Sequence, residues 1–418
     1  MTLRFKGYMI ALLLVAPVLV DGASEWPAWR GPNLNGLVPD ANPPIEWSET
    51  SNIRWKSEIP GLGLATPVVW GDRIYVQTAV RVDSMLHQYK LLALDRQSGE
   101  VVWERTARQA APNEERHHPT ASRASTSGIT DGEHVYAYFG SQGLFCYDLE
   151  GNLKWEKDLG DMQTAHMFGE GGGAALHGNT LLINWDHEGD SFIVAMDKGS
   201  GKELWRKTRK EGTSWSTPFV VEHDGRHQVI VSASGKTRSY DLKTGEVIWE
   251  CAGLGSNVIP TPLHQDGVVY VTSGHRRPAM QAILLDKAKG DITGTDAVVW
   301  SLDRDTPYVS SPLLTEGRLY FVKNRNAVLS CYDAASGKAL YGPMRLEGFG
   351  SVYASLVGAG DRIYISDLDG NTLVIRNSSE FEVLATNKLE DGFGSSPMII
   401  GDELYLRGQK YLYRIQVE

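Results

Sequence analysis

Cysteine is scarce in this chain, which argues against a fold held together by disulfide bonds. Of the 418 residues only three are cysteines, Cys146, Cys251 and Cys331. A disulfide framework in an exported protein needs more of them, and an even number. Cys146 and Cys331 occupy equivalent places in two similar segments, each followed by tyrosine and aspartate. We therefore expect buried, small apolar side chains here rather than a disulfide or a metal site.

Basic residues are also in the minority. The chain has 41 lysines and arginines against 51 aspartates and glutamates, a formal net charge of −10. It has no basic patch or arginine-rich arm, so binding to a nucleic-acid backbone or to an anionic membrane surface is not a function that this sequence supports. The composition is otherwise ordinary, and its 42% of hydrophobic residues suffices for a large core.

Long hydrophobic runs are missing after the first two dozen residues. Arg4 and Lys6 precede an apolar run over residues 9–20, and the small residues Gly22, Ala23 and Ser24 follow. This arrangement predicts a signal peptide over residues 1–24 and therefore a periplasmic or extracellular protein. The alternative, an uncleaved anchor, is disfavoured because the run is shorter than the roughly 20 residues of a membrane span. No cysteine lies near the expected cleavage site to carry a lipid anchor.

Glycine and tryptophan, in contrast, are frequent, with 44 and 12 residues. They recur in a unit of roughly 42–60 residues, a period typical of repeat architectures. Each unit opens with a small residue and often proline, as in Thr66-Pro67, and continues to a tight pair such as Gly71-Asp72. Such pairs tolerate the positive φ of a hairpin turn. An alternating strand follows, as at residues 74–76.

The second half of the unit has a strand ending in aspartate, a turn with glycine and a strand with tryptophan. Four short antiparallel strands at this period predict a β-propeller, in which neighbouring blades cover each other's apolar faces. A buried indole hides ~150–250 Å², worth at most about 4–6 kcal/mol at ~25 cal/mol per Å². We therefore assign a structural docking role between blades to Trp55, Trp103, Trp155, Trp205, Trp249 and Trp300.

The eighth unit is incomplete at the C-terminus, and its missing strand stands near the N-terminus. The chain ends after a third strand at residues 411–415, without a tryptophan strand. Residues 53–58, with Trp55, read like the tryptophan strand around Trp103. The sequence therefore predicts an all-β fold, an eight-bladed propeller of four-stranded antiparallel blades over residues 53–418, closed by this N-terminal strand. We expect residues 25–52 to form an ordered extension packed on the propeller surface.

The repeat resembles that of the quinoprotein dehydrogenases, which use pyrroloquinoline quinone (PQQ). The clearest matches are residues 93–103, ALDRQSGEVVW, and residues 240–249, YDLKTGEVIW. The whole chain, including WPAWRGP at residues 26–32, is similar to exported PQQ-binding-like β-propeller repeat proteins. The resemblance implies the fold; its members include dehydrogenases and a protein-binding scaffold, the outer-membrane assembly-factor lipoprotein, which binds no quinone.

The features that the resemblance would require of a dehydrogenase are not found in this sequence. Quinoprotein alcohol dehydrogenases hold Ca²⁺ through Glu, Asn and Asp side chains, use an Asp base and often carry two adjacent cysteines. No such ligand set can be aligned here, and adjacent cysteines and a C-x-x-C-H haem motif are lacking. No Ser-His-Asp arrangement is visible either, so we assign no catalytic residue. PQQ and Ca²⁺ are expected only under the alternative of a quinone-dependent oxidoreductase acting on alcohols or sugars.

Three loops contain residue types that also occur in metal or phosphate sites. His117 and His118 are adjacent on a long connection and point in different directions on extended chain, which disfavours a shared metal. The carboxylates of residues 186–190 fit no standard calcium loop, so we interpret this segment as solvated. Residues 169–173 are rich in glycine but open a strand, and therefore lack the helix N-terminus of a phosphate cradle.

Binding chemistry is expected on one face of the ring. In a propeller, the connections that lead into the innermost strands and the loops between second and third strands open together around the central channel. We call these segments the axial loops; here the connections are residues 107–125, 160–172, 208–216, 252–260 and 304–310, and the loops include residues 186–190, 275–278, 323–326 and 367–370. They vary most in length and chemistry, whereas the turns on the other face are nearly identical. Binding residues concentrate on such loops.

The axial loops predict a pocket or groove that favours an anionic group. The residues expected to line it are His117, Arg123, His166, Trp215, Asn257, His275, Arg276, Lys323 and Arg325. The leading hypothesis is an exported, monomeric, non-catalytic binding or scaffolding propeller, with a protein partner or a small anionic or carbohydrate ligand on this face. A polysaccharide- or cell-wall-binding module is a further alternative, which the tryptophan-rich residues 25–52 would suit.

Overall fold

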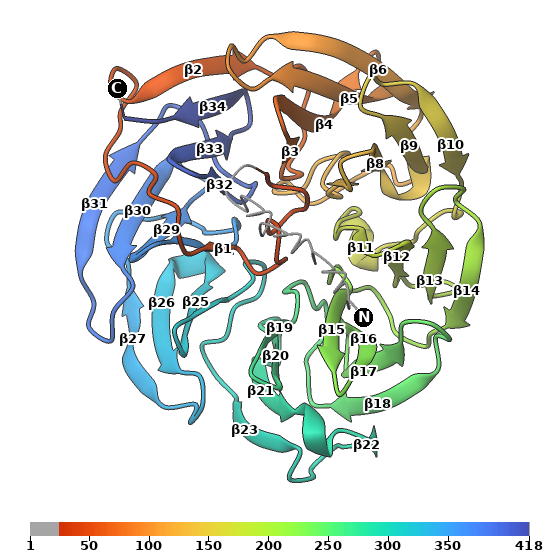
Figure 1. Cartoon of the computed structure of the whole chain (residues 1–418), viewed down its shortest axis with the longest axis vertical. Coiled ribbons are helices and arrows are strands. Elements are labelled where there is room, and N and C mark those ends of the chain that lie inside the picture. Colours follow the sequence, from red (N-terminus) through yellow and green to blue (C-terminus); the bar gives the residue numbers. More distant parts are fainter. Residues whose placement is uncertain (1–24, 418) are drawn as a thin grey trace, which may run out of the picture.

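Eight antiparallel sheets stand around a central axis in the computed structural model, which describes residues 25–417. Each sheet contributes four strands that run outward from the axis, in chain order in all blades but the eighth, and four short 3₁₀ turns are the helical elements of the described chain. Figure 1 shows the ring from above. The predicted eight-bladed β-propeller is therefore confirmed.

The strands of each blade follow from the innermost outward. Blade 1 comprises β3 (Val68–Trp70), β4 (Arg73–Arg81), β5 (His87–Asp95) and β6 (Val101–Ala110); blade 2, β7 (Ile129–Thr130), β8 (His134–Tyr138), β9 (Leu144–Asp148) and β10 (Leu153–Lys157); blade 3, β11 (Ala175–His177), β12 (Thr180–Trp185), β13 (Phe192–Asp197) and β14 (Glu203–Thr208); blade 4, β15 (Phe219–His223), β16 (Arg226–Ser232), β17 (Lys236–Asp241) and β18 (Val247–Ala252).

The second half of the ring repeats the pattern. Blade 5 comprises β19 (Leu263–Gln265), β20 (Val268–Ser273), β21 (Ala279–Leu284) and β23 (Val298–Leu302); blade 6, β24 (Leu313–Thr315), β25 (Arg318–Lys323), β26 (Val328–Asp333) and β27 (Ala339–Arg345); blade 7, β28 (Val357–Ala359), β29 (Arg362–Ser366), β30 (Asn371–Arg376) and β31 (Val383–Lys388); blade 8, β32 (Met398–Ile400), β33 (Glu403–Arg407), β34 (Tyr411–Ile415) and β2 (Ile53–Glu58). Two short strands, β1 (Leu37–Val38) and β22 (Gly290–Asp291), add to blades 7 and 4. The 3₁₀ turns are η1 (Gly140–Gln142), η2 (Ala165–Met167), η3 (Leu285–Lys287) and η4 (Asn324–Asn326).

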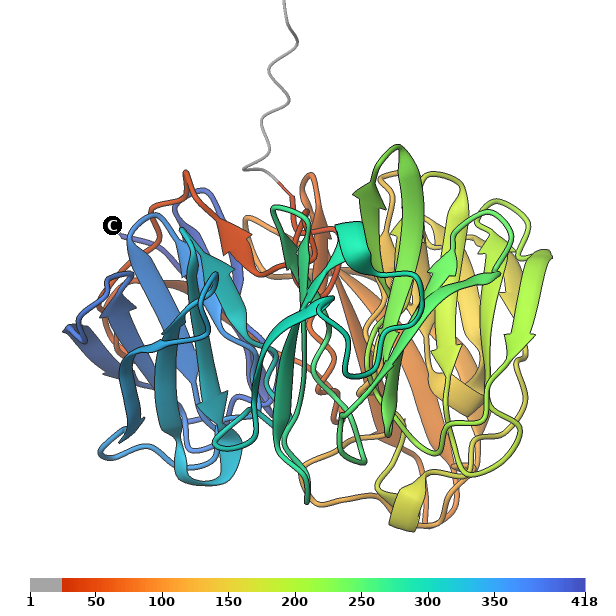
Figure 2. The same cartoon turned by 90° about the horizontal axis from the view of Figure 1, so that it is seen from below.

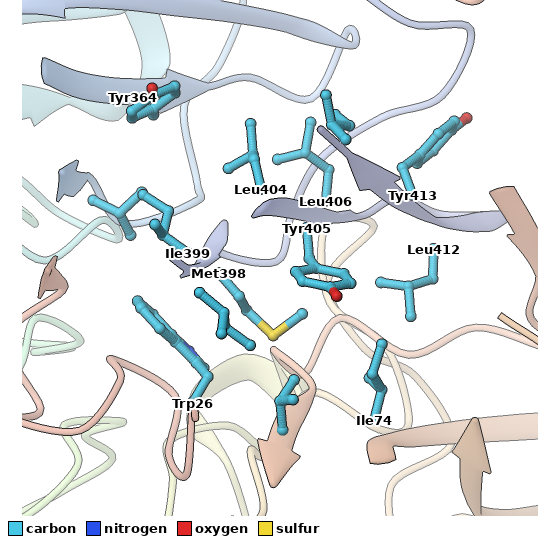
Figure 3. Packing of buried hydrophobic residues seen from close by; sticks show 14 of the residues in the cluster. Trp26, Ile74, Tyr364, Met398, Ile399, Leu404, Tyr405, Leu406, Leu412 and Tyr413 are labelled. Carbon is cyan, nitrogen blue, oxygen red and sulfur yellow. The ribbon is translucent and has the colours of Figure 1, made fainter. Parts of the chain in front are cut away.

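Blade 8 is built from both ends of the chain. Strand β2 pairs antiparallel with β34, and Ile53 lies opposite Ile415. The predicted closing strand is thus where the sequence placed it. Figure 3 shows the buried core at this seam, where Tyr405 and Leu412 of blade 8 pack near Ile74 of blade 1. The ring therefore depends on segments that are about 350 residues apart in the sequence.

Five of the six tryptophans assigned to docking join neighbouring blades in the same way. Each indole Nε1 donates a hydrogen bond of 2.9–3.0 Å to a main-chain carbonyl in the next blade's turn between its third and fourth strands. A glycine of that turn faces the indole; a Cβ added at Gly99 would lie 2.6 Å from Trp55. Gly99 also has a φ of +74°, which favours glycine. This contact explains why the glycine and the tryptophan recur together.

Trp249 differs from the other docking tryptophans. Its side chain is fully buried, and its Nε1 donates to Oε1 of Gln228 in its own blade at 3.1 Å. The turn of blade 5 carries an insertion whose strand β22 runs parallel to β18, with Gly290 beside Trp249. The insertion covers the indole completely, so the usual hydrogen bond to the next blade is replaced.

The small residues that open the repeats form a belt of hydrogen bonds around the axis. The main-chain N–H of Thr261 donates to the hydroxyl of Ser311, and Ser311 N–H donates to Ser355. Ser355 N–H in turn donates to Ser396, and Ser396 N–H to Thr66. A hydroxyl at this position therefore ties each of blades 5 to 8 to the next blade, and its small size keeps the centre of the ring open.

Residues 25–52 reach deeper than the surface packing that we expected. Trp26 bridges Val69 of blade 1, and Ala28 bridges Ile129 of blade 2, both on or beside innermost strands. Strand β1 then pairs in parallel with β28 of blade 7. In Figure 2 this segment, drawn in red, enters the ring from the face opposite η2. The first part of the extension therefore crosses the central channel on the side of the short turns.

The second part of the extension compensates for a defect in blade 7. This blade has Leu384 where the other units carry tryptophan or tyrosine. Trp47 stacks on Tyr364 with ring centroids 6.4 Å apart, while the Tyr364 hydroxyl donates to the carbonyl oxygens of Pro43 and Pro44. Trp47 thus supplies the aromatic contact that the blade itself lacks.

The remaining expectations concern cysteines and membrane segments. All three cysteines are buried and unpaired, as predicted for small apolar residues. Within residues 25–417, none of the helical elements has the length and apolar character to traverse a bilayer. The predicted signal peptide, residues 1–24, lies outside the described residues.

Candidate ligand-binding site

The channel holds a cavity of about 230 Å³ on the axial-loop face. Residues from the connections leading into all eight blades contribute to its lining, and Trp29 of the extension joins them. The indole Nε1 of Trp29 donates to the hydroxyl of Ser396, one of the belt residues, at 3.2 Å. Because the extension crosses the channel on the opposite side, the cavity is a blind pocket with Trp29 at its floor.

Aromatic side chains dominate the wall of this pocket. Trp29, Phe168, Trp215, Tyr308 and Tyr353 all line it and are partly exposed. Trp215 is held by a hydrogen bond of 2.8 Å from its Nε1 to the carbonyl of Gly169. Fixed aromatic faces with few polar groups are typical of sites that take a planar or apolar ligand part.

Basic side chains from blades 5 and 6 line one part of the pocket. His275 and Arg325 line it from the axial loops of blades 5 and 6, and the His275 ring lies 5.0 Å from that of Tyr308. Burial lowers the pKa of His275, and the positive charges of Arg276, Arg325 and His166 lower it further. Within the described chain, neither Arg325 nor Arg276 forms an ion pair. This side of the pocket therefore carries uncompensated positive charge, which favours an anion.

Glu170 is the one carboxylate in the described lining. Its Oε2 accepts a hydrogen bond of 2.6 Å from the N–H of Ser141. Gly140 makes the approach possible, because a Cβ there would lie 1.6 Å from the carboxylate oxygen. Burial raises the pKa of Glu170 to about 7, and Glu114 and Asp161 act in the same direction. Near neutral pH this side chain is therefore partly protonated and offsets less of the positive charge.

The structure brings only some of the predicted site residues to this pocket. Trp215, His275 and Arg325 line it. Arg276 and His166 lie close enough to His275 to affect its pKa, while Asn257, which is buried, hydrogen-bonds the Tyr308 side chain.

The remaining three predicted residues do not line the pocket either, so six of the nine lie outside its lining. Lys323 pairs with Asp305 at 2.9 Å, so its charge is neutralised. His117 and Arg123 lie in a separate cleft beside blade 1. Their positions in the sequence do not show which way these side chains point.

Sequence reasoning missed Trp29, Phe168, Glu170, Tyr308 and Tyr353. A signal was present for two of them, because Tyr308 and Tyr353 stand two or three residues before the small residue that opens their units, as Trp215 does. No repeat position marks Trp29, since it comes from the extension. Glu170 was hidden within a run of glycines.

The interpretation of residues 186–190 as a solvated loop is wrong for its first member. Asp186 is buried and accepts hydrogen bonds from Nε and Nη2 of Arg209 at 2.6 and 3.0 Å. Ser214 donates to the same carboxylate at 2.5 Å. A buried arginine in the next connection therefore uses this aspartate as its counter-ion, a long-range pairing that the local sequence does not reveal.

The pocket fits an anion better than a divalent cation. Ca²⁺ takes six to eight oxygen ligands, several of them from carboxylates, and the described lining offers Glu170 alone. Two groups of described residues have metal-ligand spacing, Asp131 with Glu133 and His134, and His223 with Asp224 and Asp286. Both lie on the turn face, away from the pocket, and Asp131 already pairs with Lys198 at 2.7 Å. The described lining therefore lacks the oxygen ligands that a quinone-bound Ca²⁺ would need.

Comparisons with known proteins give relatives of this propeller. The sequence model of a family described as "Outer membrane protein assembly factor BamB" matches residues 40–176 and 189–418. The outer membrane protein assembly factor BamB of Alkalilimnicola ehrlichii is 22% identical over 224 residues, 54% of this chain and 52% of that protein. The chain thus spans about half the length of this curated relative.

Solved structures share the fold at low sequence identity. BamB from Moraxella catarrhalis superimposes with a TM-score of 0.60 at 12% identity, covering 87% of this chain and 99% of that one. Quinohemoprotein alcohol dehydrogenase from Comamonas testosteroni gives a TM-score of 0.65 at 11% identity, covering 94% and 80%. The likeness extends to both an assembly factor and an enzyme, so it supports the fold alone.

Proposed function

Because this chain belongs to the family of the outer membrane protein assembly factor BamB, we propose that it is an exported, non-catalytic binding propeller. The ligand is a protein segment or small molecule that places an anionic, planar group in the central pocket. The name of the relatives supports a location in the periplasm or at the outer membrane and a protein as partner. We propose that the chain acts as a monomer.

The observation that carries this proposal is the pairing of an unneutralised arginine with aromatic walls. Among the described residues, Arg325 lines the pocket and forms no ion pair, and the indoles of Trp29 and Trp215 line the same pocket. A carboxylate accepts charge-assisted hydrogen bonds from guanidinium, and a planar group stacks on an indole. The binding hypothesis needs no more than these contacts, whereas catalysis needs a nucleophile or a base in reach of a reacting atom.

The experiment follows tryptophan fluorescence, since two indoles line the pocket. We titrate isophthalate, a planar dicarboxylate, and compare it with the uncharged isophthalamide of the same shape. Isophthalate should quench the emission with saturation and the amide should not. Because a charge-assisted hydrogen bond contributes roughly 1.5–3 kcal/mol, Arg325→Ala should weaken binding about tenfold or more, and Arg276→Ala should also weaken it.

The matched control is Arg304→Ala, an exposed arginine on a neighbouring connection of the same face. It removes the same charge outside the pocket and should leave both affinity and melting temperature unchanged. Equal binding of the diamide, or unaltered binding by Arg325→Ala, would refute an anion site. Saturable quenching by a neutral oligosaccharide alone would favour the carbohydrate alternative.

A further inference from the structure

A second concave site lies at the edge of the axial-loop face, beside blade 1. Strands β4 and β5 of this blade each have nine residues, longer than the strands of the other blades. Their connecting hairpin, residues 82–86, therefore projects beside the connection that leads into blade 2. The cleft between them is lined by Arg81, Ser84, Met85, His87, Ala111, Pro112, Glu115, Arg116, His117 and Arg123.

The cleft gathers positive charge in a chain that is acidic overall. Three arginines line it, Arg81, Arg116 and Arg123, and none of them forms an ion pair among residues 25–417. Arg81 and Arg123 donate instead to the main-chain carbonyls of Asp83 and Glu115, at 2.8 and 3.0 Å. The lining contains a single carboxylate, that of Glu115. Carbonyl oxygens thus hold the guanidinium groups of Arg81 and Arg123 in place while their charge remains available.

Two histidines converge on the same cleft. His87 is half-buried, and its Nδ1 is shielded from solvent without a hydrogen-bond partner. Burial lowers the pKa of His87, and so do the charges of Arg123, Arg81 and His117, with Asp83 opposing them. Arg81, His87, His117 and Arg123 all line this one cleft, so it presents a clustered basic site rather than scattered surface groups.

A small cavity lies between the cleft and the central pocket. It shares Pro112, His117 and Arg123 with the cleft and Ser125, Gly169 and Glu170 with the pocket. The hairpin also exposes two apolar side chains, Val82 at 50% and Met85 at 69%. The cleft and the small cavity together form an elongated site with arginines at its outer end and apolar side chains on its rim. Such a site fits an extended polypeptide better than a single small ion.

We propose that this cleft binds an acidic, extended segment of a partner polypeptide, whose carboxylates pair with Arg81, Arg116 and Arg123. Apolar side chains of the segment contact Val82 and Met85. The site shares a face with the central pocket but uses a different set of cations, so it stands whether or not the pocket takes its proposed ligand. The hairpin at residues 82–86 and the connection leading into blade 2 together form the docking surface, and the rigid ring holds them in place.

The test measures binding of fluorescein-labelled hexaglutamate by anisotropy, with hexalysine as the charge-reversed peptide. Hexaglutamate should bind and hexalysine should not. The double variant Arg81→Gln/Arg116→Gln should weaken hexaglutamate about a hundredfold, or about tenfold for each arginine, a factor that corresponds to about 1.4 kcal/mol. Both arginines are exposed, so the fold should be retained. The Met85→Ser variant should weaken binding of a hexaglutamate peptide that carries an added leucine, but not of hexaglutamate itself.

The matched control is Arg304→Gln/Arg345→Gln, two exposed arginines near the axial loops of blade 6. It should change the affinity less than twofold; an equal loss in both double variants would reveal long-range attraction only and overturn the proposal. Arg325→Gln should leave hexaglutamate binding intact. If Arg325→Gln abolished it and the cleft variant did not, the peptide would belong to the central pocket, and the cleft proposal would fail while the proposed function stood. Binding to phosphatidylglycerol vesicles without binding to hexaglutamate would replace the peptide by a lipid surface.

Discussion

Replacing Glu170 by glutamine should alter how the stability of the propeller depends on pH. Burial raises the pKa of this carboxyl from 4.5 to about 7. The folded state therefore binds the proton more tightly than the unfolded chain does. As the pH rises from about 4.5 to 7, the unfolded chain releases its proton first, and folding loses free energy. Above pH 7 the carboxylate is ionised in both states, and the loss is complete.

The size of the effect follows from the two pKa values. A rise from 4.5 to about 7 corresponds to about 3 kcal/mol at ~1.36 kcal/mol per pH unit. About 2.5 kcal/mol of this should develop between pH 5 and pH 8. Glutamine has no proton to release, and its side-chain oxygen can still accept the hydrogen bond from Ser141 N–H. The Glu170→Gln variant should therefore gain stability relative to the parent as the pH rises.

Urea unfolding at pH 5, 6, 7 and 8, followed by circular dichroism, measures this difference. The matched control is Glu347→Gln, an exposed glutamate, which should leave the difference constant across the series. If the free energies of unfolding of the Glu170→Gln variant and the parent differed by the same amount at pH 5 and pH 8, the carboxyl would titrate normally. The Glu170 side chain would then be ionised near neutral pH, and the pocket wall would carry its full negative charge.

Four further outcomes are expected. Trp55→Ala and Trp103→Ala should each destabilise the whole ring by about 3–5 kcal/mol, and a local loss of structure in Trp55→Ala without a shift in the unfolding midpoint would contradict the role of β2. Trp47→Ala should lower the thermal midpoint because Tyr364 loses its cover, whereas Trp47→Phe should retain most of the stability. Calorimetric titration with PQQ and Ca²⁺ should show no stoichiometric, Ca²⁺-dependent binding; its detection would favour the oxidoreductase alternative. N-terminal sequencing of the native protein should find a chain beginning near residue 24 or 25, and retention of Met1 would contradict export by cleavage.

The repeat made the scaffold predictable. Gly99 and Trp55 illustrate why. The same glycine–tryptophan contact occurs five times around the ring, so the two residue types recur at a regular spacing in the sequence. Trp249 escaped the rule because an insertion in another blade covers it. The hydrogen bond from Ser311 N–H to the Ser355 hydroxyl is likewise reflected in the sequence, because each repeat opens with a small residue.

The binding pocket was much less predictable than the ring. Its position on the axial-loop face depends on the architecture, which the repeat specifies. Its chemistry depends on single side chains such as Trp29 and Glu170, which occur once and have no equivalents in other units. Lys323 looked available in the sequence and is paired with Asp305. Contacts between loops decide whether a charged side chain has an ion-pair partner, and a periodic sequence pattern does not specify such contacts.

The way in which the ring closes also sets the order in which the chain can finish folding. Strand β2 is synthesised about 350 residues before its partner β34. Until β34 arrives, Trp26 and Trp47 have no completed wall to pack against, and the outer edge of blade 1 is unsupported. Contacts between such distant segments make folding slow, and the incomplete ring exposes strand edges that can aggregate. A nascent chain of this protein should therefore depend on protection by chaperones until β34 can pair with β2.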